Sequence, residues 1–238
     1  MCIRDRARCV RLLAVETMRM RKKAWARPEL ARCPYFIGTP EEWKGRWGEW
    51  FPEKRPIHLE LGCGKGVFLA KLAPLHPEIN YIGVDQSPDV LGVARRNLEE
   101  AYGEQEKPVH NVALIAHHIE DMPKVVDLSD GVERLYINFC NPWPKVRHHK
   151  RRMTHPNQLE VYKSFLADGA EIHFKTDDEA LYLSTLRYFT ESGFTLLRST
   201  KNLHAEQWEE SPSTEHEQMF SARGIPIKAA IALWGGTK

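Results

Sequence analysis

The sequence lacks the features that would place it outside the ordinary globular proteins. Its five cysteines are scattered over 238 residues without a CxxC pair, which argues against a zinc ribbon or a disulfide framework and fits a reducing cytosol. No internal repeat and no low-complexity tract is present, and the longest apolar run near the C-terminus, 229–234, is too short to span a bilayer. Hydrophobic residues make up 42% and charged residues 28%, so we expect a globular protein with a sizeable core.

The small net charge of +2 is unevenly distributed along the chain. Residues 1–32 contain ten Lys or Arg and three acidic residues, a net charge of +7, which leaves about −5 for the remainder. Such an arm indicates a polyanionic partner, although a solvated tail explains it equally well. Arg11 interrupts the nearby apolar stretch, so no signal peptide is expected. We predict a basic N-terminal arm over 1–50 and one catalytic domain over 51–238.

From Ile57 onward, short apolar runs alternate with amphipathic stretches, which is typical of βαβ units and a parallel sheet. Strands are expected at 57–61, 81–84, 112–116, 134–139, 171–174, 194–199 and 227–233. Helices are expected at 67–75, 88–102, 157–166 and 178–192, and a loop at 141–152. No convincing helix separates the last two strands, so we expect them to pair antiparallel at one edge of the sheet.

A glycine-rich turn follows the first expected strand, with the sequence E-L-G-C-G-K-G from Glu60 to Gly66. A Walker loop is excluded because Lys65 is not followed by Ser or Thr, and the GxGxG spacing departs from the dinucleotide pattern GxGxxG. The pattern E-x-G-x-G-x-G is similar to that of S-adenosylmethionine (SAM) methyltransferases. Asp85 ends the second strand, where nucleotide-binding folds place a carboxylate for ribose hydroxyls. Together these features favour a nucleotide site over a solvent-facing turn.

The fourth expected strand leads into the segment 141–145, Asn-Pro-Trp-Pro-Lys. Ligands of open α/β sheets lie beyond the carboxyl ends of the strands, so this loop should lie beside the cofactor. Trp143 offers a stacking face there, or else packs inside a rigid structural loop. With Lys145, the run Arg147–Arg152 gives five Lys or Arg in eight residues, plus two His. This density beside an expected site favours phosphate contacts over a solvated face.

Taken together, and in their order along the chain, these motifs resemble those of the bacterial tRNA (guanine-N7)-methyltransferases. Members of that family use SAM to methylate a variable-loop guanosine of tRNA. The resemblance covers about residues 18–234 and includes the segments 20–26, 173–178 and 214–217. It implies an α/β, Rossmann-like class I methyltransferase fold with a mostly parallel seven-stranded sheet, one antiparallel edge strand, and helices on both faces. It also implies a cytoplasmic enzyme that needs no metal or membrane and is a monomer or weak homodimer.

The resemblance further implies roles for individual residues, carried over position by position. The implied cofactor contacts are Glu60, Gly62, Gly64, Gly66, Asp85, His118 and Asn141. The implied guanosine-side contacts are Lys145, Asp177, Thr214, Glu215, His216 and Glu217. The implied RNA contacts are Arg147, His148, His149, Lys150, Arg151 and Arg152. Of these residues, Asn141 and Asp177 are the expected catalytic pair.

The chain departs from the family pattern at three places. Asn141 stands where the family usually has an Asp regarded as catalytic, and His118 replaces an Asp near the adenine ring, where Glu120 or Asp121 could substitute. Residues 1–17 have no counterpart, so we expect the native start at Met18 or Met20 and the upstream stretch to be non-native. Guanine N7 carries a lone pair and no proton, so methylation needs no general base. We therefore expect activity despite Asn141.

Two other functions stay open on the sequence alone. Amino-methyltransferases carry [DN]PP[YFW], which 141–143 superficially resembles, but the second Pro before the aromatic residue is absent and the basic run is unexplained. A non-catalytic RNA-binding protein would keep the fold after losing the usual Asp. The presence of Glu60, Asp85, Asp177 and Glu217 argues against such a loss of catalytic activity.

Overall fold

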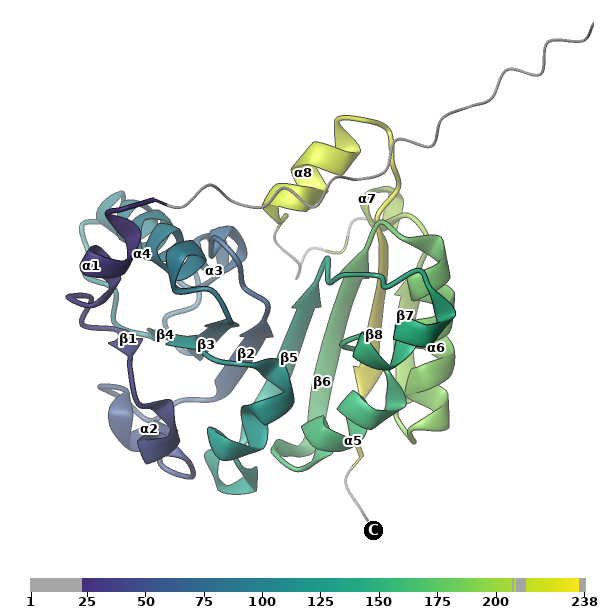
Figure 1. Cartoon of the computed structure of the whole chain (residues 1–238), viewed down its shortest axis with the longest axis horizontal. Coiled ribbons are helices and arrows are strands. Elements are labelled where there is room, and N and C mark those ends of the chain that lie inside the picture. The colour runs from purple at the N-terminus through teal and green to yellow at the C-terminus, as the bar shows by residue number, and fades with distance from the viewer. Residues whose placement is uncertain (1–22, 207, 209–212, 236–238) are drawn as a thin grey trace, which may run out of the picture.

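The computed structural model describes residues 23–206, 208 and 213–235. They form a twisted sheet with helices packed around it (Figure 1). The strands are β1 (Phe36–Ile37), β2 (Ile57–Leu61), β3 (Asn80–Asp85), β4 (Val112–Ala116), β5 (Val132–Asn138), β6 (Leu166–Thr176), β7 (Thr195–Thr200) and β8 (Lys228–Leu233). Their order is β1-β4-β3-β2-β5-β6-β8-β7. All neighbours pair in parallel except β6 with β8 and β8 with β7.

The helices connect these strands and cover the sheet. The α-helices are α1 (Ala26–Leu30), α2 (Trp47–Trp50), α3 (Val67–Leu72), α4 (Pro88–Gly103), α5 (Pro156–Lys163), α6 (Glu179–Glu191), α7 (Leu203–Glu206) and α8 (Glu215–Ser221). The 3-10 helices are η1 (Pro40–Trp43), η2 (Ile119–Lys124), η3 (Leu128–Asp130) and η4 (Val146–Arg151). The sheet runs in chain order from β2 outward to β4, then resumes with β5 on the other side of β2. This reversal creates a switch point between β2 and β5.

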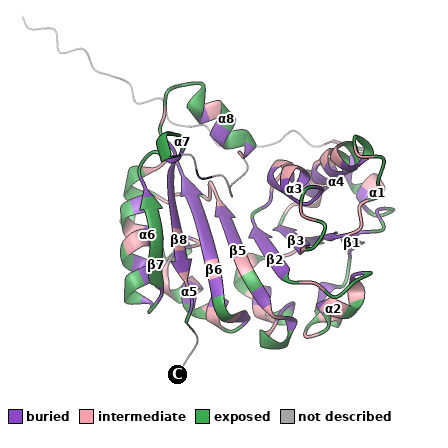
Figure 2. Ribbon diagram, turned by 180° about the vertical axis from the view of Figure 1, so that it is seen from behind, coloured by how far each residue is buried: buried purple, intermediate pink, exposed green. Residues whose placement is uncertain are grey.

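Alternation of side chains along the strands produces a core on each face of the sheet. In β3, Ile82 belongs to a cluster that includes α5 and α6, whereas Tyr81 belongs to a cluster that includes α3 and α4. Figure 2 shows the central strands buried and β7 exposed along the sheet edge. Helices therefore cover both faces, and the predicted fold class is confirmed.

The sheet differs from the prediction in three details. The described residues contain an eighth strand, β1, whose two residues are too few to give a sequence signal. The antiparallel strand β8 lies between β6 and β7, so β7 forms the edge. Two short helices, α7 and α8, separate β7 from β8 where we expected none. A capping box, in which Thr214 and Glu217 bond each other's backbone amides, fixes the start of α8.

The predicted division into an arm and a catalytic domain at residue 50 stays a prediction. Within the expected arm, residues 23–50 pack on the body, and Ala26 is fully buried against α4. A Cβ added to Gly92 of α4 would stand 2.6 Å from the backbone oxygen of Ala26, so the two helices touch closely. Trp47 is also fully buried and donates to a backbone carbonyl. Residues 1–22, which include the stretch expected to be non-native, lie outside the described residues.

Candidate active site

Polar side chains gather where the parallel strands β2, β3, β5 and β6 end, because the carboxyl ends of parallel strands share one edge. Glu60 lies in β2, Asp85 ends β3 and Asn138 ends β5. Lys175 lies near the end of β6, and Asp177 follows this strand directly. The edge includes the switch point between β2 and β5, where open α/β sheets bind ligands.

The glycine loop adopts a conformation that other residues rarely adopt. Gly62, Gly64 and Gly66 have φ angles of 74°, 54° and 66°. A Cβ at Gly66 would stand 2.8 Å from the Cβ of Ala94, so this glycine permits α3 to pack on α4. At Gly62 and Gly64, an added Cβ would meet no protein atom closer than 3.9 Å. The backbone at these two positions is therefore open to a ligand.

Asp85 is fixed by its neighbours at the end of β3. Its Oδ1 accepts from the Ser87 amide at 2.8 Å, and its Oδ2 accepts from the Gly64 amide at 3.2 Å. Partial burial raises the pKa of Asp85, while these two hydrogen bonds oppose the rise. The glycine loop and the acid after it thus form one unit, as a nucleotide site requires.

Glu60 is a buried carboxylate with one oxygen left unpaired. Glu60 is 3% exposed, and its Oε1 accepts a hydrogen bond from Asn138 Nδ2 at 3.0 Å. Its Oε2 has no hydrogen-bond partner among the described residues. Burial raises the pKa of Glu60 to about 8, partly opposed by the Asn138 bond and by the charge of Lys175. A buried acceptor without a partner at a ligand-binding edge fits a ligand that donates to it or carries positive charge.

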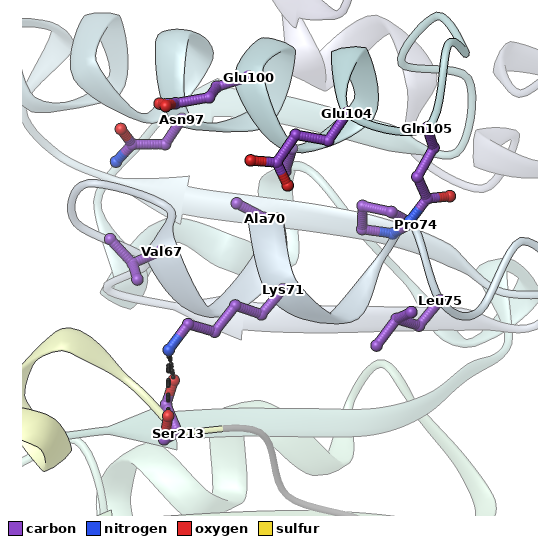
Figure 3. Close-up of a pocket in the computed structure, with 11 residues that line it drawn as sticks. Val67, Ala70, Lys71, Pro74, Leu75, Asn97, Glu100, Glu104, Gln105 and Ser213 are labelled. Atoms are coloured by element: carbon purple, nitrogen blue, oxygen red, sulfur yellow. Dashed lines mark hydrogen bonds between the residues drawn. The ribbon is translucent and has the colours of Figure 1, made fainter.

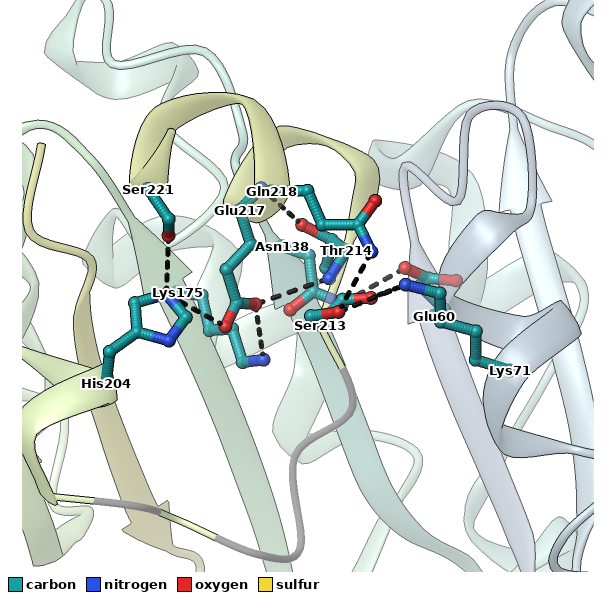
Figure 4. A network of polar contacts seen from close by, with 10 residues as sticks. All are labelled: Glu60, Lys71, Asn138, Lys175, His204, Ser213, Thr214, Glu217, Gln218 and Ser221. Carbon is teal, nitrogen blue, oxygen red and sulfur yellow. Dashed lines mark hydrogen bonds and ion pairs between the residues drawn. The ribbon is translucent and has the colours of Figure 1, made fainter. Parts of the chain in front are cut away.

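The segment 213–221, which contains α8, crosses this edge and is held by lysines (Figure 4). Lys175 donates to Glu217 Oε2 at 2.9 Å, with both side chains buried. On the other side, Lys71 donates to the backbone oxygen and hydroxyl of Ser213 at 2.9 and 3.0 Å. Lys65, inside the glycine loop, pairs with Glu215 at 2.8 Å. The predicted guanosine-side segment is therefore tethered to both halves of the edge.

Asn141 lies exposed in the loop after β5, and its side chain shapes that loop. Its Oδ1 accepts from the Trp143 amide at 3.0 Å, the hydrogen bond of an Asx turn. Trp143 and Phe139 have positive φ angles of 43° and 52°, so the loop holds two residues in left-handed backbone conformations. The Asn141 side chain thus has a structural role beside its predicted catalytic one.

The predicted RNA-contacting run folds as the short helix η4. Arg147, Lys150 and Arg151 are exposed, whereas His148 and His149 are half-buried. Arg151 also lies over the Trp143 ring, 5.2 Å from its centroid.

Arg152 differs from the rest of the run. It is 2% exposed, and its Nε donates to the Pro142 carbonyl at 2.8 Å. Its Nη1 has no hydrogen-bond partner among the described residues. Arg152 therefore anchors the loop through Nε, and its RNA contact stays a prediction.

The structure places the other predicted residues as follows. His118 is exposed just after β4, whose last residue pairs with Asp85. Of its proposed substitutes, Glu120 is exposed and Asp121 pairs with Lys124 at 2.7 Å. Lys145 is exposed, and Asp177 is half-buried with a pKa that burial raises. His216 stacks on Phe139 with ring centroids 5.6 Å apart.

Two residues of this edge had no assigned role in the sequence. Asn138 binds Glu60, and Lys175 binds Glu217. The carboxylate of Glu217 therefore accepts hydrogen bonds both from a buried lysine and from the Thr214 amide that it caps. A lysine inside the apolar strand 172–176 is a signal that was available, because a buried lysine needs a partner. The identity of that partner could not be read from the sequence.

A separate groove lies between α3 and α4, with a cavity volume of about 670 Å³ (Figure 3). Its polar lining includes Lys71, Asn97, Glu100 and Glu104, and none of the predicted site residues lines it. Among the described residues, no helix is long and apolar enough to cross a membrane. The same part of the chain has no group of three side chains able to hold a metal ion.

Comparison with known proteins agrees with this geometry. A family model described as putative methyltransferase matches residues 54–230. The chain is 52% identical over 216 residues to the tRNA (guanine-N(7)-)-methyltransferase of Clostridium beijerinckii, covering 91% of this chain and 99% of that protein. It is 46% identical over 215 residues to the protein of the same name from Acetivibrio thermocellus, covering 90% and 99%.

Solved structures resemble the fold at low sequence identity. The 16S rRNA methyltransferase KamB has a TM-score of 0.57 and 13% identity, covering 76% of this chain and 88% of that one. A 16S rRNA (adenine(1408)-N(1))-methyltransferase from Catenulisporales acidiphilia has a TM-score of 0.55 and 13% identity, covering 84% and 92%. These two likenesses concern the fold, whereas the sequence matches identify the family. The chain belongs to the tRNA (guanine-N7)-methyltransferase family.

Proposed function

We propose that this chain transfers a methyl group from SAM to N7 of a guanosine in the variable loop of tRNA, in the cytoplasm. The observation that carries this proposal is the convergence of the open glycine loop, Glu60 and Asp85 at one edge of the sheet. The relatives that share about half of the residues are named for the same reaction on tRNA. The predicted monomer or weak homodimer stays a prediction.

The residues at this edge fit SAM. Glu60 has an unpaired buried oxygen suited to the cationic amino group of the cofactor. Asp85 ends β3, where a carboxylate accepts from ribose hydroxyls. Gly62 and Gly64 allow a ligand to approach the backbone. When bound, SAM supplies an electrophilic methyl group on a sulfonium sulfur.

The protein's contribution to such a transfer is alignment and electrostatics. Guanine N7 attacks with a lone pair, so no side chain has to remove a proton. The base becomes positively charged as the methyl group arrives, and the half-buried carboxylate of Asp177 can stabilise that charge. Asn141 holds the loop after β5 in place through its bond to Trp143.

The proposal is tested by incubating the protein with tritiated SAM and unmodified tRNA, followed by nuclease digestion and nucleoside analysis. We expect the label in 7-methylguanosine, mapped to the variable loop. Label in N6-methyladenosine would instead identify an amino-methyltransferase. Absence of transfer by a protein that binds tRNA would identify a non-catalytic relative.

Neutralising exposed basic residues of η4 is expected to weaken tRNA binding. The double substitution Arg147→Gln/Lys150→Gln should reduce the slope of log affinity against log salt by about two units, because each lost phosphate contact removes about one. SAM affinity should not change. The measurement is tRNA binding over a salt series, with Arg187→Gln on the exposed face of α6 as the matched control. An unchanged slope in the double variant would assign η4 to a solvated surface.

A further inference from the structure

Lys175 lies at the centre of the carboxyl edge, yet it belongs to neither the predicted cofactor set nor the predicted guanosine-side set. Its side chain is 4% exposed, and its ammonium group donates to Glu217 of α8 at 2.9 Å. The ammonium nitrogen also lies 5.9 Å from the ring centroid of Phe68 in α3. One buried cation thus contacts elements from both halves of the proposed site.

The pair formed by Lys175 and Glu217 is a buried polar attachment of α8, beside the apolar packing of Phe220 in the same helix. With seven residues, α8 is too short to be stable without tertiary contacts. Lys65 and Glu215 also tie it down, but their side chains are 40% and 48% exposed, and such surface pairs contribute little. The Glu217 side chain is only 3% exposed. Loss of its lysine partner would leave this buried carboxylate with the Thr214 amide and with His204, whose Nε2 lies 3.6 Å from Glu217 Oε1.

Lys175 also lies beside Asn138, the residue that binds Glu60 on the cofactor side of the edge. Asn138 of β5 is its register partner on the neighbouring strand, and the amide of Asn138 binds Glu60 of β2 (Figure 4). The positive charge of Lys175 acts on Glu60 and lowers the pKa of that carboxyl. Lys175, Asn138 and Glu60 therefore lie in a row across the sheet edge, from the lysine that binds α8 to the carboxyl group of Glu60.

We infer that Lys175 is a positioning residue for the proposed methyl transfer: it holds the N-terminal end of α8 over the sheet edge and supplies positive charge beside the Asn138–Glu60 pair. This inference rests on the proposed function, because Glu60 is its cofactor contact. Lys175 acts through Glu217 and Glu60 rather than on the reacting atoms. Lys175 thereby links the position of α8 to the ionisation of the Glu60 carboxyl group.

The surroundings of Glu60 identify Lys175 as its source of positive charge. Asp85 from β3 raises the pKa of Glu60, as burial does, whereas Lys175 from β6 lowers it. Cys63 from the glycine loop and Tyr136 from β5 also interact with Glu60, but burial raises the pKa of both, so they stay neutral near pH 7. Removing the charge of Lys175 should make Glu60 harder to ionise.

The test measures binding of S-adenosylhomocysteine, which carries the same amino group as SAM, by calorimetry between pH 6 and 9. Wild-type affinity should rise with pH through a midpoint near 8, where Glu60 ionises. In Lys175→Met and in Lys175→Met/Glu217→Gln, the midpoint should move up by about one pH unit or more, with affinity at pH 7.5 reduced about tenfold. The double variant leaves neither charge buried alone, so it is the one that should keep its fold.

Two further variants separate positioning from a structural role. Lys175→Arg keeps the charge and should keep the wild-type midpoint. Lys163→Met removes a lysine paired with Glu160 on α5 and should follow the wild type throughout. An unshifted midpoint in the folded double variant would overturn the inference, as would an equal shift in Lys175→Arg. Failure of the wild type to methylate tRNA would overturn the proposed function instead.

Discussion

Replacing Glu60 by Gln is expected to weaken SAM binding about a hundredfold while making the protein more stable at pH 8. The loss of affinity follows from removing an ionised acceptor, worth about 1.5–3 kcal/mol. The gain in stability follows from the burial of this carboxyl group, which has an unpaired oxygen. The structure thus keeps a destabilising group at the position where the proposed function needs it.

The sign of the pH dependence follows from the two states of the chain. Glu60 has a pKa of about 8 when folded, against 4.5 ordinarily, so the folded protein retains a proton that the unfolded chain loses. Its contribution to stability is fully present below about pH 4.5 and is lost as the pH rises to 8. Above about pH 8, the folded protein contains Glu60 as an ionised, buried carboxylate. Gln cannot ionise, although its own amide lacks a partner, so we expect a net gain of about 2 kcal/mol at pH 8.

The measurement is urea unfolding of wild type and Glu60→Gln between pH 5 and 9, with calorimetry of S-adenosylhomocysteine. The exposed Glu53→Gln variant is the control, since its side chain is largely in solvent. Between pH 5 and 8, the free energy of unfolding of Glu60→Gln should fall less than that of the wild type. Parallel curves, or unchanged binding, would contradict the account of Glu60 as a buried, cofactor-facing acid.

Much of the fold could be predicted because its elements carry strong local signals. β2 has the predicted bounds, since an apolar run ends there at a glycine turn, and α4 begins at the predicted Pro88. β1 could not be predicted, because two residues carry no periodicity and their pairing with β4 is a long-range contact. α8 begins at a capping-box pattern, but the sequence predicts only a guanosine-side role for 214–217 and no helix there.

The candidate site could be predicted only in part, because side-chain orientation and long-range contacts carry no local sequence signal. Asp85 follows from the rule that the carboxyl ends of parallel strands meet at one edge. Glu60 follows from the resemblance of the pattern E-x-G-x-G-x-G to that of SAM methyltransferases. Arg152 could not be separated from Arg151, because a run of basic residues does not show which side chain turns inward. The partner of Lys175 could not be found, since Glu217 lies 42 residues away in the chain.

The second large effect is expected at Asp177. Asp177→Ala should lower the methyl-transfer rate by about 10²–10³, because it removes a half-buried carboxylate from the side where positive charge develops. The fold should persist, since the hydrogen bond from Lys228 to this residue goes to its backbone oxygen. Asn141→Asp should stay within about tenfold of wild type, or 1.4 kcal/mol of barrier, because a carboxylate can also accept from the Trp143 amide. Asn141→Ala should fall between these variants, since it loses the acceptor that shapes the loop.

The comparison is made as single-turnover transfer at saturating SAM and tRNA, with Asp178→Asn as the matched control. Asp178 is the neighbouring carboxylate and caps α6, and Asn retains the acceptor that this cap needs, so its variant should transfer at close to the wild-type rate. The order of rates separates two accounts of Asn141. If this position only orients the loop, wild type is active and Asp adds little. If instead wild type is inactive and Asn141→Asp restores transfer by several orders of magnitude, the reaction needs a full charge at residue 141, and the positioning account fails.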